Sequence, residues 1–180
     1  QEKEVEQVLE MSEQLAGHGI EIDPHTAIIL GHAAKLAGRT HSAEQNYLRA
    51  LETFRQNRNR DGEAASLNCI GLIAQDRGDL DEAERLIRES ADIRRQIGDR
   101  YGKAITLVNL GNIVQRRGDL VEAERLQRES LFIFREIGKR EDEASPLANL
   151  GNIAYARGDL AEAERLVLEA KSIYQGVGDK

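Results

Sequence analysis

Cysteine, proline, tryptophan and long apolar runs are scarce or missing in this chain, and each absence excludes a class of protein. The 180 residues include one cysteine, two prolines and no tryptophan. A single cysteine cannot close an internal disulfide, which excludes a disulfide-stapled secreted scaffold. No apolar run approaches the roughly 18 residues of a membrane-spanning helix, and no basic segment precedes an apolar one as in a signal peptide. We therefore expect a cytoplasmic protein that has no membrane partner.

Glycine is plentiful, and its positions reveal an internal repeat. Scarce proline with abundant Ala, Leu, Glu and Arg favours helices, whereas 16 glycines would interrupt them. Gly71, Gly111 and Gly151 are 40 residues apart, and Gly31 extends the series toward the N-terminus. Residues 71–110 and 111–150 are identical at 24 of 40 positions. Chance does not produce that agreement, so the chain is built from repeats.

Each repeat unit predicts two helices. From Leu80 to Ile97, small and apolar residues recur at steps of three and four, which is the helical period. Asp79 with Glu82 three residues later predicts a capping box. A glycine in the middle of a helix costs about 1 kcal/mol relative to alanine, so the recurrence of Gly111 in every unit predicts close helix–helix approach. The nine predicted helices span 2–16, 24–37, 41–56, 61–76, 80–97, 101–116, 120–137, 143–156 and 160–175.

The pairing of Leu-Gly in the first helix with alanine in the second resembles the tetratricopeptide repeat (TPR) family. Instances are Leu30-Gly31 with Ala43, Ile70-Gly71 with Ala83, Leu110-Gly111 with Ala123 and Leu150-Gly151 with Ala163. The period is 40 rather than the standard 34 of the family, and the usual aromatic after the alanine is present only as Tyr47. The chain thus resembles the long-repeat variety that has Asn-Leu-Gly-Asn in its first helices. The resemblance implies an all-α, right-handed superhelix (α-solenoid) of about nine antiparallel helices, with first helices lining a concave groove.

The repeats predict a single solenoid domain over residues 1–180. Its parts are 1–23 (the second helix of a partial repeat and a linker), 24–60 (a degenerate repeat 1), 61–100 (repeat 2), 101–140 (repeat 3) and 141–180 (repeat 4). The chain stops where another first helix would begin. We expect a fragment of a longer array or self-association through an exposed end, unless this is a natural C-terminus.

Asparagines recur on the side of the first helices opposite their apolar stripe. A carboxamide offers two donors and an acceptor, which suits both polar groups of a peptide backbone, and the resemblance implies that asparagines here hold ligand main chain. The alternative is hydrogen bonding to neighbouring helices. The candidate partner-binding residues are Asn68, Asn109, Asn112, Gln115, Arg116, Asn149, Asn152 and Tyr155, with His25, His32 and Lys35 in repeat 1.

No catalytic, metal or cofactor site is expected, and the chain is not predicted to be an enzyme. His25 and His32 lie seven residues apart, about 10.5 Å along a helix, which is too far for both to bind one ion. They form either a basic, pH-sensitive end of the groove or ordinary helix surface. Cys69 has no evident base partner. The segment 98–103 is one residue short of a phosphate loop and lacks the Ser/Thr after its lysine.

Charge is distributed unevenly, and this bears on the partner. The net charge is −7, and residues 1–23, with seven acids and one lysine, contribute −6 of it. No basic stripe is present, so nucleic acid is not an expected partner. The Arg-rich, Ala-rich composition points to a prokaryotic source. Phe132 replaces the Glu52, Asp92 and Ser172 of other repeats, and either forms a second contact patch or is covered by a neighbouring helix.

The sequence therefore predicts a non-catalytic scaffold that binds an extended peptide or a helical segment of a partner protein in its concave groove. The alternative is an effector-sensing domain, for a peptide or metabolite, within a larger bacterial signalling or transcription regulator. The identity of the partner is not encoded in any motif.

Overall fold

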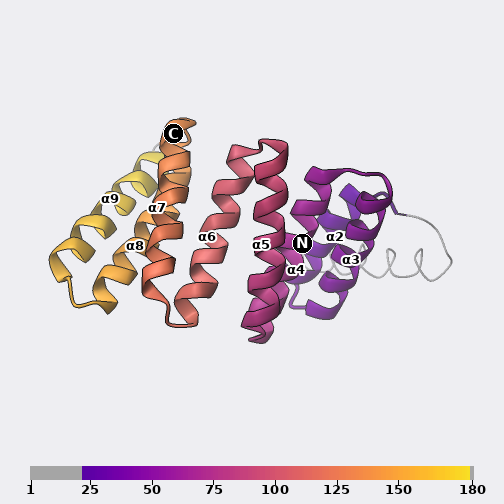
Figure 1. Cartoon of the computed structure of the whole chain (residues 1–180), viewed down its shortest axis with the longest axis horizontal. Coiled ribbons are helices and arrows are strands. Elements are labelled where there is room, and N and C mark those ends of the chain that lie inside the picture. The colour runs from indigo at the N-terminus through magenta and orange to yellow at the C-terminus, as the bar shows by residue number, and fades with distance from the viewer. Residues whose placement is uncertain (1–21, 179–180) are drawn as a thin grey trace. The chain divides into compact units, whose positions relative to one another are not determined.

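The chain is all-α. The structure is a computed structural model that describes residues 22–178, so the predicted helix 2–16 lies outside the described residues (Figure 1). Within 22–178 there is no strand. The helices are α2 (Pro24–Leu36), α3 (Thr40–Gln56), α4 (Arg60–Arg77), α5 (Leu80–Ile97), α6 (Arg100–Arg116), α7 (Leu120–Glu136), α8 (Ala144–Ala156) and α9 (Leu160–Gly178).

The eight described helices begin and end within a few residues of the predicted bounds, with one difference. The prediction starts the eighth helix at residue 143, whereas a 3-10 turn, η1 (Arg140–Glu143), precedes α8. Pro146 lies in the first turn of α8, where its missing N–H has no helical acceptor to lose. The 3-10 turn ends at Glu143 and α8 begins at the next residue, so the two elements are continuous.

Short turns join the helices into pairs, and the chain divides into two compact units after Ile93. In the N-terminal unit (residues up to 93), α2 packs on α3, α3 on α4, and a core forms around Tyr47, Leu67 and Ile73. In the C-terminal unit (residues from 94), α6 packs on α7 and α8 on α9, and one core cluster forms around Leu147, Leu150 and Leu166.

The predicted N-caps are confirmed, but their partner carboxylates act differently from the capping box. The backbone N–H of Glu82 donates to Asp79 Oδ1 at 3.1 Å, and the same bond recurs at Glu122 and Glu162. The Glu82 carboxylate accepts two bonds from Arg85, three residues further along the helix. Those bonds lower the pKa of Glu82, because they favour its ionised form.

The recurring mid-helix glycines mark close helix contacts, as predicted. A Cβ placed on Gly31 would lie 2.3 Å from the Tyr47 ring, and one on Gly111 would lie 2.4 Å from Gln127 Nε2. The corresponding distances are 2.5 Å at Gly71, to an atom of Ile87, and 2.8 Å at Gly151, to an atom of Val167. A Cβ at Gly31 would meet a buried ring, whereas one at Gly151 would meet a side chain that is 46% exposed.

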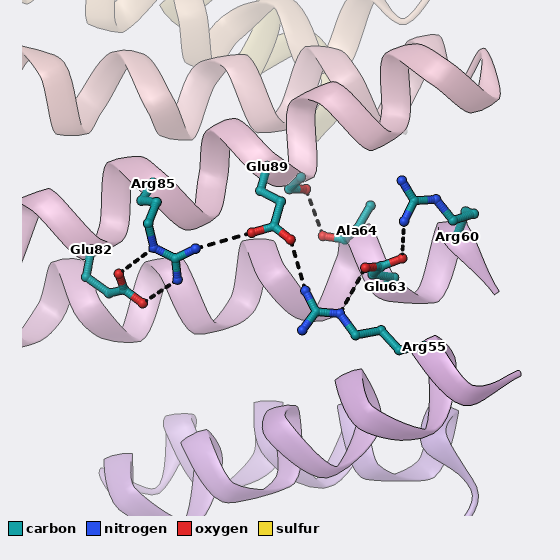
Figure 2. A network of polar contacts seen from close by, with 8 residues as sticks. Arg55, Arg60, Glu63, Ala64, Glu82, Arg85 and Glu89 are labelled. Atoms are coloured by element: carbon teal, nitrogen blue, oxygen red, sulfur yellow. Dashed lines mark hydrogen bonds and ion pairs between the residues drawn. The ribbon is translucent and has the colours of Figure 1, made fainter. Parts of the chain in front are cut away.

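Ion pairs connect successive helices in a pattern that repeats along the chain. Figure 2 shows the Arg55 guanidinium on α3 between the carboxylates of Glu63 on α4 and Glu89 on α5, at 2.9 Å from each. In the C-terminal unit, Arg135 likewise contacts Glu143 at 3.1 Å and Glu169 at 2.7 Å. An arginine near the end of one second helix thus joins the next two helices.

Candidate functional site

The candidate site lies on the exposed side of the first helices, which we call the first-helix face. In the C-terminal unit it is formed by α6 and α8, which contact each other. In the N-terminal unit it is formed by α2 and α4, which also contact each other. The helical period aligns positions three and four residues apart on this face.

In the C-terminal unit the predicted residues lie at or near the surface. Asn109, Asn112, Gln115 and Asn149 are half-buried. The more exposed members are Arg116, Asn152 and Tyr155, and the Tyr155 ring is 69% exposed. Two adjacent helices therefore present a row of carboxamides with an exposed aromatic ring at the end of α8.

One of these carboxamides has an architectural contact. Asn112 Oδ1 accepts a hydrogen bond of 3.1 Å from Nε2 of Gln127, which is fully buried on α7. Gln127 Nε2 also donates to the Val108 carbonyl at 3.1 Å, and Val108 itself is buried. The alternative left open by the sequence, hydrogen bonding to a neighbouring helix, thus applies to Asn112.

Asn149 differs from Asn112. Its Nδ2 is buried and has no hydrogen-bond partner in the protein. Burying an unsatisfied donor costs about 1–3 kcal/mol. The protein therefore leaves one buried donor of Asn149 unsatisfied.

In the N-terminal unit, the three basic candidates contact other side chains of the unit. The His25 ring packs edge-on against the buried ring of Phe54, with centroids 5.0 Å apart. Lys35 Nζ forms an ion pair of 2.9 Å with Asp76 on α4. Asn68 is half-buried on α4.

His32 joins two residues that sequence analysis did not connect. The Tyr47 hydroxyl lies 3.0 Å from His32 Nδ1, and Cys69 Sγ lies 4.0 Å from His32 Nε2. The expectation that Cys69 lacks a base nearby is therefore wrong: these residues are far apart in sequence, and the packing of α2 on α4 brings them together. Burial raises the pKa of Tyr47, so its hydroxyl stays protonated. Burial, followed by the charge of Lys35, lowers the pKa of His32.

Between residues 22 and 178, no group of three or more His, Cys, Asp or Glu side chains is placed to hold a metal ion. In the same part of the chain, no helix combines the length and apolar character needed to cross a membrane.

The sequence and the fold were compared with known proteins. The family profile described as tetratricopeptide repeat matches three overlapping stretches, 24–96, 62–136 and 103–176. The chain belongs to the TPR family. Membership suggests a protein-interaction scaffold, and families with this fold are generally non-catalytic. No curated protein matches the chain.

Several solved structures share the fold of this TPR protein. BtubC from P. vanneervenii has a TM-score of 0.79 at 21% identity, covering 99% of this chain and 75% of BtubC. A putative kinesin light chain from Podosopora anserina, with nearly identical TPR-like repeats, has a TM-score of 0.75 at 16% identity, covering 98% and 89%. RapI in its apo form has a TM-score of 0.80 at 16% identity, covering 93% of this chain and 62% of RapI. At these identities the likeness concerns the fold alone.

Proposed function

We propose that the protein is a non-catalytic scaffold whose first-helix face holds an extended peptide or a helical segment of a partner protein. The observation that carries this proposal is the placement of carboxamides at equivalent, partly exposed positions of adjacent first helices. Asn109 and Asn149 occupy the same position in successive repeats, one on α6 and one on α8.

Carboxamides suit this role because they bond both polar groups of a peptide. An extended chain presents alternating N–H and C=O groups, and each asparagine can accept from one and donate to the other. The unpartnered Nδ2 of Asn149 supports the proposal, since turning this amide toward a ligand carbonyl breaks no hydrogen bond of that group. Asparagine is a mediocre helix former, so its presence mid-helix in successive repeats calls for a compensating contact.

Apolar groups beside the carboxamides would hold ligand side chains. Tyr155 is 69% exposed and Ile105 is 36% exposed. Aromatic anchors combined with main-chain hydrogen bonds give affinity in many peptide grooves. The expected ligand is therefore a segment with a regular backbone and at least one apolar side chain.

The proposal is tested by affinity capture from the source organism. Bait proteins are the wild type, the double variant Asn109→Ala/Asn149→Ala, and Asn57→Ala, which changes an exposed asparagine at the end of α3. We expect a partner that binds the double variant at least tenfold more weakly, which corresponds to about 1.4 kcal/mol, and binds the Asn57 variant normally. Equal affinity of wild type and double variant for the partner, measured with purified proteins, would refute the assignment to this face.

A further inference from the structure

The packing of α2, α3 and α4 brings together three titratable side chains: the His32 imidazole, the Tyr47 phenol and the Cys69 thiol. His32 Nδ1 lies 3.0 Å from the Tyr47 hydroxyl, and His32 Nε2 lies 4.0 Å from Cys69 Sγ. The Tyr47 ring also packs edge-on against the His32 ring, with centroids 5.4 Å apart. A nucleophile beside a base that a third group holds in place is the arrangement of an activated thiol.

Two repeat periods further along the chain, in the C-terminal unit, the same three positions carry carboxamides. They are Asn112, Gln127 and Asn149. The contact between the first two is kept there, since Gln127 Nε2 donates to Asn112 Oδ1 at 3.1 Å. Carboxamides do not titrate, whereas imidazole, phenol and thiol groups do. The N-terminal unit thus keeps this helix junction and replaces all three carboxamides by titratable groups.

The cluster reaches solvent at the first-helix face. His32 is exposed, and the Tyr47 ring behind it is buried. Cys69 is 9% exposed, which limits the reagents that reach its sulfur to small molecules. Hydrogen peroxide, with two heavy atoms, is small enough. A contact of 4.0 Å is compatible with proton transfer, because the hydrogen bonds of catalytic groups are often long before the reagent binds.

His32 is suited to accept the thiol proton because its ring is neutral at pH 7. Burial, followed by the charge of Lys35, holds the pKa of His32 below its ordinary value of 6.5. When the ring proton is on Nδ1, that N–H donates to the Tyr47 hydroxyl oxygen and leaves the lone pair of Nε2 on the side of Cys69. Only the thiolate is a strong nucleophile, so the transfer of its proton to Nε2 activates Cys69.

We propose that Cys69 is an oxidation site, at which a small hydroperoxide converts the thiol to a sulfenic acid, with His32 as the base and Tyr47 as a positioning residue. The thiol proton passes to His32 Nε2, and the thiolate attacks the terminal oxygen of the peroxide. The S–O bond forms as the O–O bond breaks, so the sulfur is oxidised and the peroxide is reduced. The leaving oxygen takes the proton back from His32 and departs as water or an alcohol.

The product has no cysteine within the chain to react with. The sequence contains one cysteine, so the sulfenic acid cannot close an internal disulfide. It persists until a low-molecular-weight thiol condenses with it, which forms a mixed disulfide and releases water. This inference stands apart from the proposed scaffold function, because the reaction needs no partner protein.

The test measures how fast hydrogen peroxide oxidises Cys69, with dimedone as the trap for sulfenic acid and intact-mass spectrometry as the readout. His32→Asn copies the residue at 112, and Tyr47→Phe keeps the buried ring but removes its hydroxyl. The matched control is His41→Asn, which removes an exposed histidine of α3 whose ring contacts Gln45. Wild type unfolded in urea gives the rate of the unactivated thiol at the same pH, and circular dichroism verifies that each variant is folded.

We expect the folded wild type and His41→Asn to form the dimedone adduct at equal rates, about tenfold faster than His32→Asn and the urea-unfolded wild type. Tyr47→Phe also slows the reaction of the folded protein, and in urea all variants react alike because the cluster is dispersed. If His32→Asn fails to fold, the comparison of folded with unfolded wild type decides. The proposal is overturned if folded wild type forms no adduct, if it reacts no faster than the unfolded protein or His32→Asn, or if His41→Asn slows the reaction equally.

Discussion

Replacing the recurring mid-helix glycines by alanine gives a direct test of how the helix pairs pack. At Gly31, alanine gains about 1 kcal/mol of helix propensity. Its Cβ, however, would lie 2.3 Å from Tyr47 Cε1, whereas carbon atoms in contact are about 3.5–4.0 Å apart. The Tyr47 ring is 1% exposed and its hydroxyl is bonded to His32, so the ring has little room to retreat.

Overpacking of this kind costs about 1–3 kcal/mol, and displacing the Tyr47 hydroxyl adds the loss of one hydrogen bond, about 1 kcal/mol. After the gain in propensity, we expect Gly31→Ala to lower the free energy of unfolding by about 1–3 kcal/mol. At Gly151 the nearest atom belongs to Val167, which is 46% exposed and can yield, so Gly151→Ala should be close to neutral. At Gly176 an added Cβ meets nothing, and alanine there should stabilise by up to about 1 kcal/mol.

Urea unfolding, followed by the helical circular-dichroism signal, measures the series. A double-mutant cycle then isolates the contact: in a Tyr47→Ala background, Gly31→Ala should become stabilising, because the clashing ring is gone. If Gly31→Ala stabilises the wild type, or costs the same in both backgrounds, then close approach to Tyr47 is not the reason for the glycine.

Three further predictions concern stability. The pKa of His32 in the folded state lies below its unfolded value of 6.5, so protonation of His32 favours the unfolded state. The free energy of unfolding should therefore fall as the pH drops below about 6.5. His32→Asn should flatten this part of a stability–pH profile. Gln127→Ile, which copies the residue at 87, removes a buried acceptor that has no partner but also the two hydrogen bonds of Nε2, so it should change the unfolding free energy by less than about 1 kcal/mol in urea denaturation. Glu63→Ala leaves Arg55 and Arg60 without their shared carboxylate and should cost more stability than the exposed-pair change Glu84→Ala, compared by thermal unfolding.

The described fold was predictable because its determinants are local and repeat. Helical periodicity, the Asp79-type caps and the glycine turns each lie within a few residues, and all recur every 40 residues. Which donor binds the Glu82 carboxylate was not predictable. A backbone N–H at the helix N-terminus and the Arg85 guanidinium compete for it, and only the side-chain geometry decides which of the two donates.

The candidate site was predictable in its residue types and less so in their contacts. The helical period puts Asn109, Asn112 and Asn149 on one side of their helices, as the structure does. The bond between Gln127 and Asn112 joins residues on different helices, and so does the contact of Cys69 with His32. Such contacts depend on how deeply one helix sits against the next, which no short sequence pattern encodes.

The central claim, that a partner peptide lies on the first-helix face, is tested most directly by NMR with selective ¹⁵N labelling of asparagine. The signals are assigned with single Asn variants, and the partner identified by affinity capture is titrated into the protein. The account predicts that the side-chain amide signals of Asn109 and Asn149 shift on binding, while those of Asn57 and Asn59, in the turn between α3 and α4, stay in place. Saturation with the partner that leaves Asn109 and Asn149 unchanged would contradict it.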